Sequence, residues 1–382
     1  MQSLKLGGDY IVHGENAISY LETLKGKKAF IVTSGKIAGQ LGQLDIVKTC
    51  LTKAGMETCC FDDVDPDPEI KSVLAGAAAM GGFQPDWIIA IGGGSAMDAA
   101  KAMWVAYENP EFDTLEKFMP PHIIPKMGLK AKLVCIPTTS GTGSEVTRSV
   151  VLSDKAMNLK LPFRSDELIP DIAILEASFT SSMPPSLTAF TGMDALTHAV
   201  ESYVSRNANN FSDAFAEKSM LGIFKYLPLA FSDPANLYYR GEMHCFSTMA
   251  GLAFANVGLG IVHSIAHAFG GIFHVPHGLA NAVLLPYVID FNRESPAAAE
   301  KYQYLEKLLG RELRTAIEDL KTQVRVPVTM QEVIRNDREF EDQLSSLIAK
   351  ALADGCTGTN PISVNGQQME ALIRDAYFGM QR

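Results

Sequence analysis

The sequence predicts an α/β domain built on a parallel sheet, followed by an all-helical domain. Short β-rich runs alternate with helical stretches in the first half, two of these runs end in glycine-rich loops, and long helical segments fill the second half. Alternation of strand and helix is typical of a parallel sheet with helices on both faces. We expect the first domain at residues 1–182 and the second at residues 183–382.

The elements expected in the first half follow one another at ordinary spacing. Apolar and β-branched composition predicts strands at residues 27–34, 56–64, 86–94 and at the start of 131–144. Helical sequence leads up to Gly55 and covers residues 68–80 and 95–107. This succession favours a Rossmann-like sheet, in which loops after parallel strands meet at one edge.

The second half carries helical periodicity interrupted by Gly and Pro. The helices are expected at residues 186–204, 210–230, 236–256, 262–273, 278–293 and 297–309. Pro184 and Pro185 cannot lie inside a helix, and we expect Ser186 to be the N-cap of the helix that follows. The domain boundary is therefore placed near residues 183–186.

Composition limits the classes of partner and compartment. The net charge of -10 argues against nucleic acid or an anionic membrane as the main partner. We see neither an apolar run of the roughly 18 residues that span a bilayer nor an apolar signal segment at the start. The six cysteines form no CxxC motif and are typical of reduced thiols, so a cytoplasmic protein is expected.

A glycine-rich loop follows the expected strand at residues 86–94. Gly93, Gly94 and Ser95 precede a helix whose unpaired N–H groups and positive dipole end favour a phosphate. Asp98, expected in the first helical turn, can cap this loop and hold its shape. The pattern is not GxGxxG, and a tight strand-to-helix turn explains it equally well.

A second polar loop, residues 138–144, follows the next expected strand. Two such loops at adjacent strand ends would meet in one crevice, which favours a dinucleotide or sugar-phosphate site. After the strand at residues 27–34 stand Ser34, Gly35 and Lys36, with no carboxylate to repel a 2′-phosphate. NADP therefore remains an alternative to NAD, although a simple turn also explains these three residues.

The helical half contains one aspartate and several histidines at ligand spacing. Residues four apart lie on one face of a helix, so two i,i+4 pairs and a further pair of histidines form a candidate site for a divalent ion such as Fe(II) or Zn(II). The residues are Asp194 and His198, His263 and His267, and His274 and His277. Spacing alone does not decide which histidines bind the metal. The run HSIAH lacks the glutamate of HExxH, which argues against a zinc protease.

Four stretches carry a resemblance to a known family: residues 91–102, 137–147, 191–203 and 258–282. Through them the chain resembles the iron-dependent (group III) alcohol dehydrogenases over essentially its whole length. Residues 97–112 are similar to the alcohol dehydrogenase half of bifunctional aldehyde–alcohol dehydrogenases. The resemblance implies a dehydroquinate synthase-like architecture, with a dinucleotide-binding domain and a metal-binding and substrate domain.

The resemblance also implies roles for individual residues. The metal ligands would be Asp194, His198, His263 and His277, and the catalytic residue beside nicotinamide and substrate would be His267. The cofactor-binding positions would be Ser34, Asp67, Gly93, Gly94, Ser95, Asp98, Thr138, Thr139, Thr142, Ser144, Val151 and Lys160. The substrate pocket would include Ser149, Phe254 and Cys356. Many members of the family carry Asp where this chain has Ser34, so the preference between NAD and NADP stays open.

The implied function is a metal-dependent oxidoreductase that transfers a hydride between NAD, or NADP, and a small primary or secondary alcohol or aldehyde. Fe2+ is the expected metal, with Zn2+ as the alternative, and a homodimer or larger homo-oligomer is expected. A glycerol-type zinc dehydrogenase and a dehydroquinate-synthase-like metal lyase are competing hypotheses. The lyase would need several basic residues around a phosphorylated sugar, and few stand near the histidines. A non-catalytic assembly module is disfavoured by the complete set of acid and histidines.

Overall fold

The computed structural model describes residues 4–65, 68–154 and 159–380, with the backbone only at residues 154, 159 and 160. The chain divides into two compact units, Met1–Ser182 and Met183–Arg382. The first unit contains a six-stranded sheet and the second is helical. The fold class expected from the sequence is thereby confirmed.

All strands of the large sheet run parallel, in the order β1-β8-β5-β4-β2-β3. Their bounds are β1 Tyr10–His13, β2 Lys28–Thr33, β3 Glu57–Phe61, β4 Trp87–Gly92, β5 Lys132–Pro137 and β8 Ile172–Leu175. A separate antiparallel pair consists of β6 Ser149–Asp154 and β7 Leu159–Arg164. Strand β3 is added to one side of β2, at the edge of the sheet, and β4 is added to the other side of β2. The order in which strands are added therefore reverses between β2 and β4. Open sheets bind ligands at the carboxyl ends of strands beside such a reversal.

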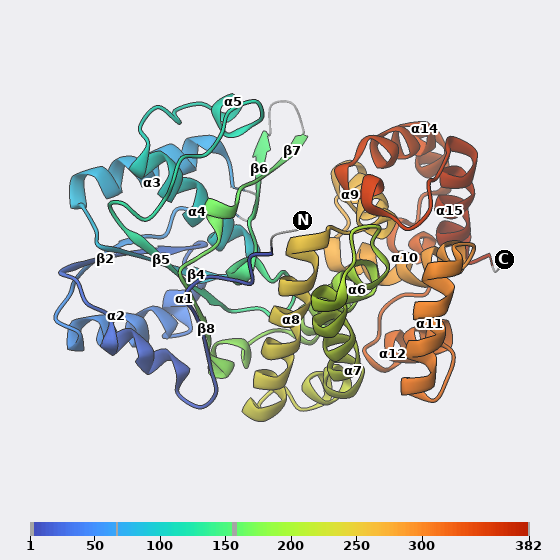
Figure 1. The fold of residues 1–382 in the computed structure, drawn as a ribbon, viewed down its shortest axis with the longest axis horizontal. Helices are drawn as coiled ribbons and strands as arrows, with labels where there is room; N and C mark the ends of the chain where they lie inside the picture. Colours follow the sequence, from blue (N-terminus) through green and yellow to red (C-terminus); the bar gives the residue numbers. More distant parts are fainter. Residues whose placement is uncertain (1–3, 66–67, 155–158, 381–382) are drawn as a thin grey trace. The chain divides into compact units, whose positions relative to one another are not determined.

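Helices cover both faces of this sheet, with α2 on one side and α3 and α4 on the other (Figure 1). Side chains of β2 alternate between two cores, so Phe30 packs with α3 and α4 whereas Ile31 packs with α2. The bounds are α1 Ile37–Gln40, α2 Gln43–Lys53, α3 Ile70–Phe83, α4 Gly94–Glu108 and α5 Leu115–Phe118. Short 3-10 helices are η1 Ala17–Thr23, η2 Ser144–Val146, η3 Asp166–Leu168 and η4 Ala177–Thr180.

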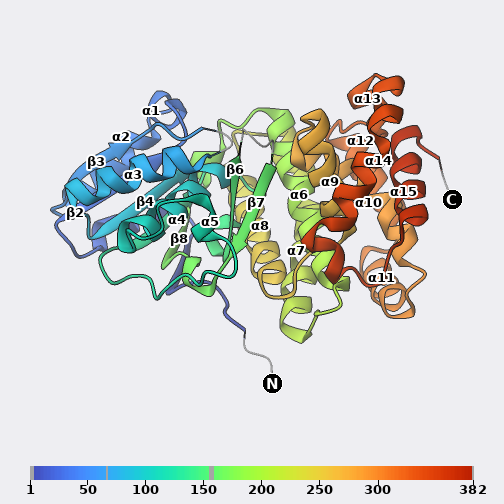
Figure 2. The same ribbon diagram turned by 90° about the horizontal axis from the view of Figure 1, so that it is seen from above.

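The second unit is a bundle around one apolar core, in which α6, α9 and α10 lie side by side in both views (Figures 1 and 2). Its first helices are α6 Pro185–Val204, α7 Asn210–Ser232, α8 Leu237–Val257, α9 Ile261–Phe273 and α10 His277–Asn292. Then follow α11 Pro296–Leu309, α12 Leu313–Gln323, α13 Met330–Ile334, α14 Asp337–Ala353, η5 Gly355–Thr359 and α15 Gly366–Phe378.

The predicted cap at Ser186 is wrong. Helix α6 begins one residue earlier, at Pro185, and Pro184 occupies the N-cap position. Proline is well suited to the first helical position, because the N–H it lacks would have no partner within the helix there. Ser186 is therefore a residue of the first turn.

Among the described residues, no single helix has both the length and the apolar composition needed to cross a membrane. Only the pair Leu237–Val257 and Ile261–Phe273, bent by 102°, meets both criteria when its members are taken together.

Candidate metal centre and nucleotide-binding loops

Helix α6 presents a polar stripe toward the interior of the second unit. Asp194, His198 and Glu201 follow one another at spacings of four and three, which places them on one helical face. All three are buried, with 4%, 5% and 3% of their surface exposed. Buried polar groups need partners, and the partners come from α9 and α10.

Three imidazoles converge on one carboxylate oxygen. The Nε2 atoms of His277, His263 and His198 lie 3.5, 3.8 and 3.9 Å from Asp194 Oδ1. His263 comes from the first turn of α9, and His277 is the first residue of α10. His274 instead ends α9 with a φ of 55°. The structure thus brings together the four residues that the resemblance assigns to the metal.

This arrangement fits a divalent ion. Tetrahedral ligands at the usual metal–nitrogen and metal–oxygen distances stand about 3.3–3.4 Å from one another, close to the separations above. The ligand atoms of Asp194, His263 and His277 all lie within 4.8 Å of one another. Burial, together with the neighbouring His198, His277 and His267, holds the pKa of His263 well below its usual value. His263 is therefore neutral, the form in which imidazole binds metals.

Glu201 fixes the orientation of His263. Its Oε2 lies 2.6 Å from His263 Nδ1, and its Oε1 accepts a hydrogen bond of 2.7 Å from the backbone N–H of Val262. With the proton on Nδ1, the lone pair of Nε2 faces Asp194. Burial raises the pKa of Glu201 to about 8, and backbone hydrogen bonds oppose this rise. A carboxylate that holds the second nitrogen of a ligand histidine is a recurring feature of metal sites.

Asn281 completes the polar cluster. Its Nδ2 donates to Asp194 Oδ1 at 2.6 Å and lies 3.2 and 3.1 Å from the Nε2 atoms of His263 and His277. Sequence reasoning missed both Glu201 and Asn281. The available signal was spacing, since Glu201 follows His198 by three residues and Asn281 follows His277 by four.

A glycine lets α10 approach α6 at this point. A Cβ on Gly278 would stand 2.2 Å from the backbone oxygen of Phe190 and 3.3 Å from the Cβ of Asp194. A larger residue at position 278 would therefore push the start of α10, and with it His277, away from Asp194.

His267 lies at the solvent side of the cluster. Its side chain is 41% exposed, and its ring stacks on that of His277 with 5.1 Å between centroids. Its Nδ1 lies 2.8 Å from Oδ2 of Asp354, the N-cap residue of η5. Two predicted pocket residues are close by, because Phe254 stacks on His198 at 4.4 Å and Cys356 follows Asp354 in the same turn.

In the first unit, the two predicted loops lie against each other. The backbone N–H of Thr138 donates to the oxygen of Gly92, and a Cβ on Gly94 would stand 3.1 Å from Thr142 Cγ2. Gly93 lies next to Thr139 in the same way. The two glycines therefore allow the second loop to pack closely against the start of α4, and the backbone N–H groups of a helix start are a favourable site for an anion.

Asp98 holds the second loop rather than the glycine-rich loop that it was predicted to cap. Asp98 was predicted to lie in the first helical turn. Helix α4 begins at Gly94, so Asp98 lies in the second turn instead. Its Oδ1 accepts from the Ser144 hydroxyl at 2.7 Å, and its Oδ2 accepts from the Val151 N–H at 2.9 Å.

Lys101, which sequence reasoning missed, is fully buried beneath these loops. Its Nζ donates to the backbone oxygens of Ser144, Thr147 and Ser149 at 2.7, 2.9 and 3.2 Å, and to the Ser144 hydroxyl at 3.0 Å. An i+3 spacing from Asp98 was the only signal in the sequence.

A pocket of about 350 Å³ lies at the carboxyl end of β2, lined in part by Gly35, Lys36 and Asp62. The sequence predicted no carboxylate here, and that expectation is wrong. Asp62 directly follows β3, which pairs with β2 in register, so its side chain reaches the same pocket. Ser34 donates to the backbone oxygen of Val64 at 3.2 Å.

The remaining predicted residues all belong to the first unit. Ser95 is in the first turn of α4, and Ser149 and Val151 belong to β6 of the first unit. Asp67 and the side chain of Lys160 lie outside the described residues.

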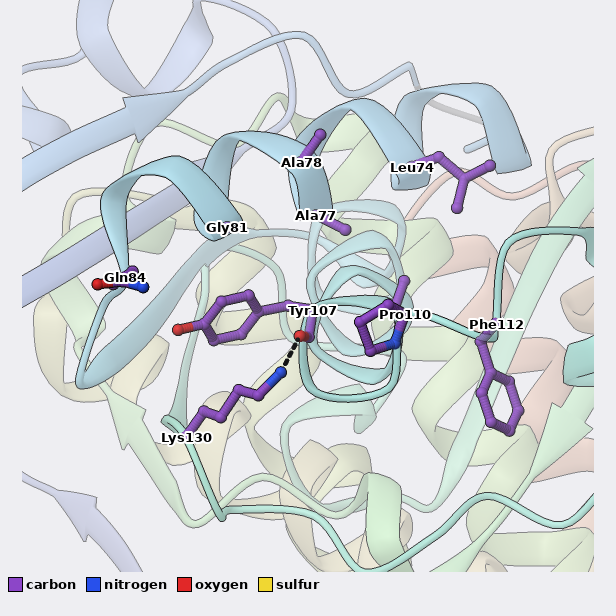
Figure 3. A pocket seen from close by; sticks show the side chains of 10 residues that line it. Leu74, Ala77, Ala78, Gly81, Gln84, Tyr107, Pro110, Phe112 and Lys130 are labelled. Carbon is purple, nitrogen blue, oxygen red and sulfur yellow. Dashed lines mark hydrogen bonds between the residues drawn. The ribbon is translucent and has the colours of Figure 1, made fainter.

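A second cavity, of about 410 Å³, opens between α3 and α4 (Figure 3). Its wall consists mainly of small and apolar side chains, with Lys130 donating to the Tyr107 backbone oxygen at 2.9 Å. Of the residues described along this wall, none is a predicted site residue.

Curated relatives match nearly the whole chain. The NADPH-dependent butanol dehydrogenase of Clostridium saccharobutylicum is 39% identical and covers 97% of both chains. The 1-propanol dehydrogenase PduQ of Citrobacter freundii is 39% identical over 95% of this chain and 96% of its own. The bifunctional aldehyde-alcohol dehydrogenase AdhE of Escherichia coli is also 39% identical, over 92% of this chain but 43% of its own length.

Solved structures match as well. An iron-containing alcohol dehydrogenase from Thermococcus thioreducens has a TM-score of 0.92 at 31% identity, over 99% of this chain and 100% of that one. The sulfoacetaldehyde reductase of Bifidobacterium kashiwanohense, solved with NAD+, has a TM-score of 0.89 at 25% identity, over 98% of both chains. These relatives favour alcohol oxidoreduction over the lyase alternative.

Two family models cover the chain between them. The model described as iron-containing alcohol dehydrogenase matches residues 9–177, and the model described as the C-terminal part of the Fe-containing alcohol dehydrogenase family matches residues 188–377. The resemblance found in the sequence is thereby confirmed, and the chain belongs to the iron-containing alcohol dehydrogenase family.

Proposed function

We propose that this metal- and NAD(P)-dependent alcohol oxidoreductase acts on short unbranched alcohols and their aldehydes, and that it holds its iron with Asp194, His198, His263 and His277. One observation carries the proposal: three imidazole Nε2 atoms lie within 3.9 Å of a single buried carboxylate oxygen. When bound there, the ion supplies a positive charge that favours the alkoxide form of an alcohol.

The protein's own residues prepare this site. Burial keeps His263 neutral, Glu201 holds its ring in place, and Asn281 donates to the Asp194 carboxylate. Phe254, stacked on His198, excludes water from one side of the cluster. A pre-organised, partly dry set of ligands binds an ion without having to rearrange.

We assign proton movement to His267. The contact of its Nδ1 with Asp354 keeps a proton on that nitrogen, so Nε2 is left to accept the hydroxyl proton of an alcohol. Its 41% exposure supports release of the proton to solvent. In the direction of aldehyde reduction the same nitrogen returns a proton.

The glycine-rich loop at Gly93 and Gly94 is proposed to bind the cofactor pyrophosphate, since nucleotide anions favour the start of a helix. The pocket at the end of β2 would then receive the adenosine ribose, with Lys36 attracting a 2′-phosphate and Asp62 opposing it. One relative is named NADPH-dependent and another was solved with NAD+. We propose that the chain accepts both cofactors, with NADPH favoured by Lys36.

The choice of short substrates rests on relatives named for butanol and 1-propanol. A cytoplasmic location and a homo-oligomeric state remain predictions. The six free cysteines support the first, because thiols persist in a reducing compartment.

A substrate screen tests the proposal. Protein loaded anaerobically with Fe2+ is assayed with linear aldehydes from acetaldehyde to hexanal, each with NADH and with NADPH. We expect turnover to be greatest for the three- and four-carbon aldehydes and to vanish when the metal is removed. Equal rates for all chain lengths would contradict the proposed substrate class, and turnover by stoichiometrically metal-free protein would contradict the metal site.

A further inference from the structure

A second group of metal-binding side chains lies next to the first. One ligand atom each of His267, Asp354 and Cys356 lies within 4.8 Å of the other two. The group joins α9 to η5, far apart in the sequence, and contains no residue of the Asp194 cluster. A site that combines thiolate, imidazole and carboxylate ligands binds Zn2+ in preference to Fe2+.

The geometry of this group is close to that of a zinc site. His267 Nδ1 and Asp354 Oδ2 are 2.8 Å apart, while ligands of tetrahedral zinc stand about 3.3 Å apart. Asp354 is held in place, because its Oδ1 accepts the Cys356 N–H at 2.8 Å. His267 and Asp354 are 41% and 20% exposed, so an ion can enter from solvent and keep water as its fourth ligand.

We propose that His267, Asp354 and Cys356 form an inhibitory zinc site, distinct from the iron site. Binding replaces the S–H bond of Cys356 by a sulfur–zinc bond and releases that proton to solvent. It also replaces the proton on His267 Nδ1, which moves to Nε2. His267 then carries a proton on the nitrogen that we assign to proton transfer, and it can no longer accept one. The inhibition rests on the proposed function, whereas the binding site does not.

Cobalt gives a direct readout of binding. A thiolate bound to Co2+ produces a charge-transfer band in the near ultraviolet, and the Asp194 cluster offers no sulfur. We expect the band when wild-type protein receives more Co2+ than the Asp194 site holds. It should persist in Asp194→Ala and in the control Cys245→Ser, and be lost in Cys356→Ser. If the band is absent from wild type, or survives in Cys356→Ser, the proposed site does not exist.

Zinc titration of the iron-loaded enzyme tests the inhibition. Each variant is compared with its own rate before zinc is added, so changes in basal rate do not enter. We expect Cys356→Ser to need at least about tenfold more Zn2+ for half inhibition, since even the loss of a residue that only supports a ligand weakens metal binding about 10- to 100-fold. A weak chelator should restore wild-type activity without added iron. Equal zinc sensitivity of Cys356→Ser and wild type would overturn the proposal, even if the band maps to Cys356.

Discussion

The Oε2 atom of Glu201 lies 2.6 Å from Nδ1 of His263, and both side chains are buried. The pair fixes which nitrogen of His263 faces Asp194, and it places a carboxylate behind the candidate ligand. We therefore expect that substitution of either partner lowers the affinity for metal while the protein remains folded.

Glu201→Gln tests this pair. The amide keeps the size of the side chain but cannot take the ionised form that a cation on His263 would favour, so metal affinity should fall about 10- to 100-fold. Competition for Fe2+ or Co2+ with a chromophoric chelator measures the affinity. Glu217→Gln, on neighbouring α7, serves as the matched control. An affinity for Glu201→Gln within twofold of wild type would show that Glu201 does not support the ligand.

Gly278→Ala tests the close contact of α10 with α6. The added methyl group would stand 2.2 Å from the Phe190 backbone oxygen, so the start of α10 must shift. We expect lower metal affinity and a loss of stability of about 1–3 kcal/mol, as for other overpacked cores. Thermal unfolding with and without metal measures both effects. Gly271→Ala, where an added Cβ meets nothing within 4 Å, is the control.

His267→Ala separates proton transfer from metal binding. We expect turnover to fall about 10²- to 10⁴-fold, the usual contribution of a general acid or base. The metal content should stay at the wild-type level, because His267 lies outside the group around Asp194 Oδ1. Loss of the metal from this variant would mean that the ligand has been misassigned.

Lys101→Met tests the support beneath the nucleotide loops. Three backbone oxygens would lose their donor, and buried unpaired groups cost about 1–3 kcal/mol each. We expect destabilisation above about 2 kcal/mol, together with a raised KM for the cofactor. Lys53→Met, which breaks an exposed ion pair with Glu22, should leave the stability nearly unchanged. Similar losses in the two variants would argue against this role of Lys101.

Lys36→Ala and Asp62→Ala test cofactor choice in opposite directions. Loss of the cation should raise KM for NADPH more than for NADH, and loss of the carboxylate should lower KM for NADPH. Steady-state kinetics with both cofactors measure the ratio. If both variants change the two KM values equally, the pocket at the end of β2 does not bind a 2′-phosphate.

The sequence allowed the parallel sheet, the helical second half and the convergence of acid and histidines to be predicted, because each depends on short-range periodicity. Phe30 and Ile31 alternate between two cores as a buried strand requires. Residues that act through long-range packing were missed. Asp354 meets His267 across 87 positions, and Asp62 reaches its pocket only because β3 pairs with β2.

Predictions from the preferences of single residues also failed where two such preferences competed. Ser186 is a good N-cap residue, yet Pro185 is an equally good first helical residue and precedes it. Asp98 was expected in the first helical turn, where it would cap the glycine-rich loop, but α4 begins at Gly94 and the carboxylate accepts from the Ser144 hydroxyl instead. Spacing could not separate His263 from His267, whereas the fold does so by turning one toward Asp194 and the other toward Asp354.

The most direct measurement is the metal content of His263→Ala beside that of His122→Ala, an exposed histidine of the first unit, after identical anaerobic loading and gel filtration. We predict about one iron per chain in wild type and in His122→Ala, and almost none in a folded His263→Ala. Full iron content in His263→Ala, or none in wild type, would contradict this prediction.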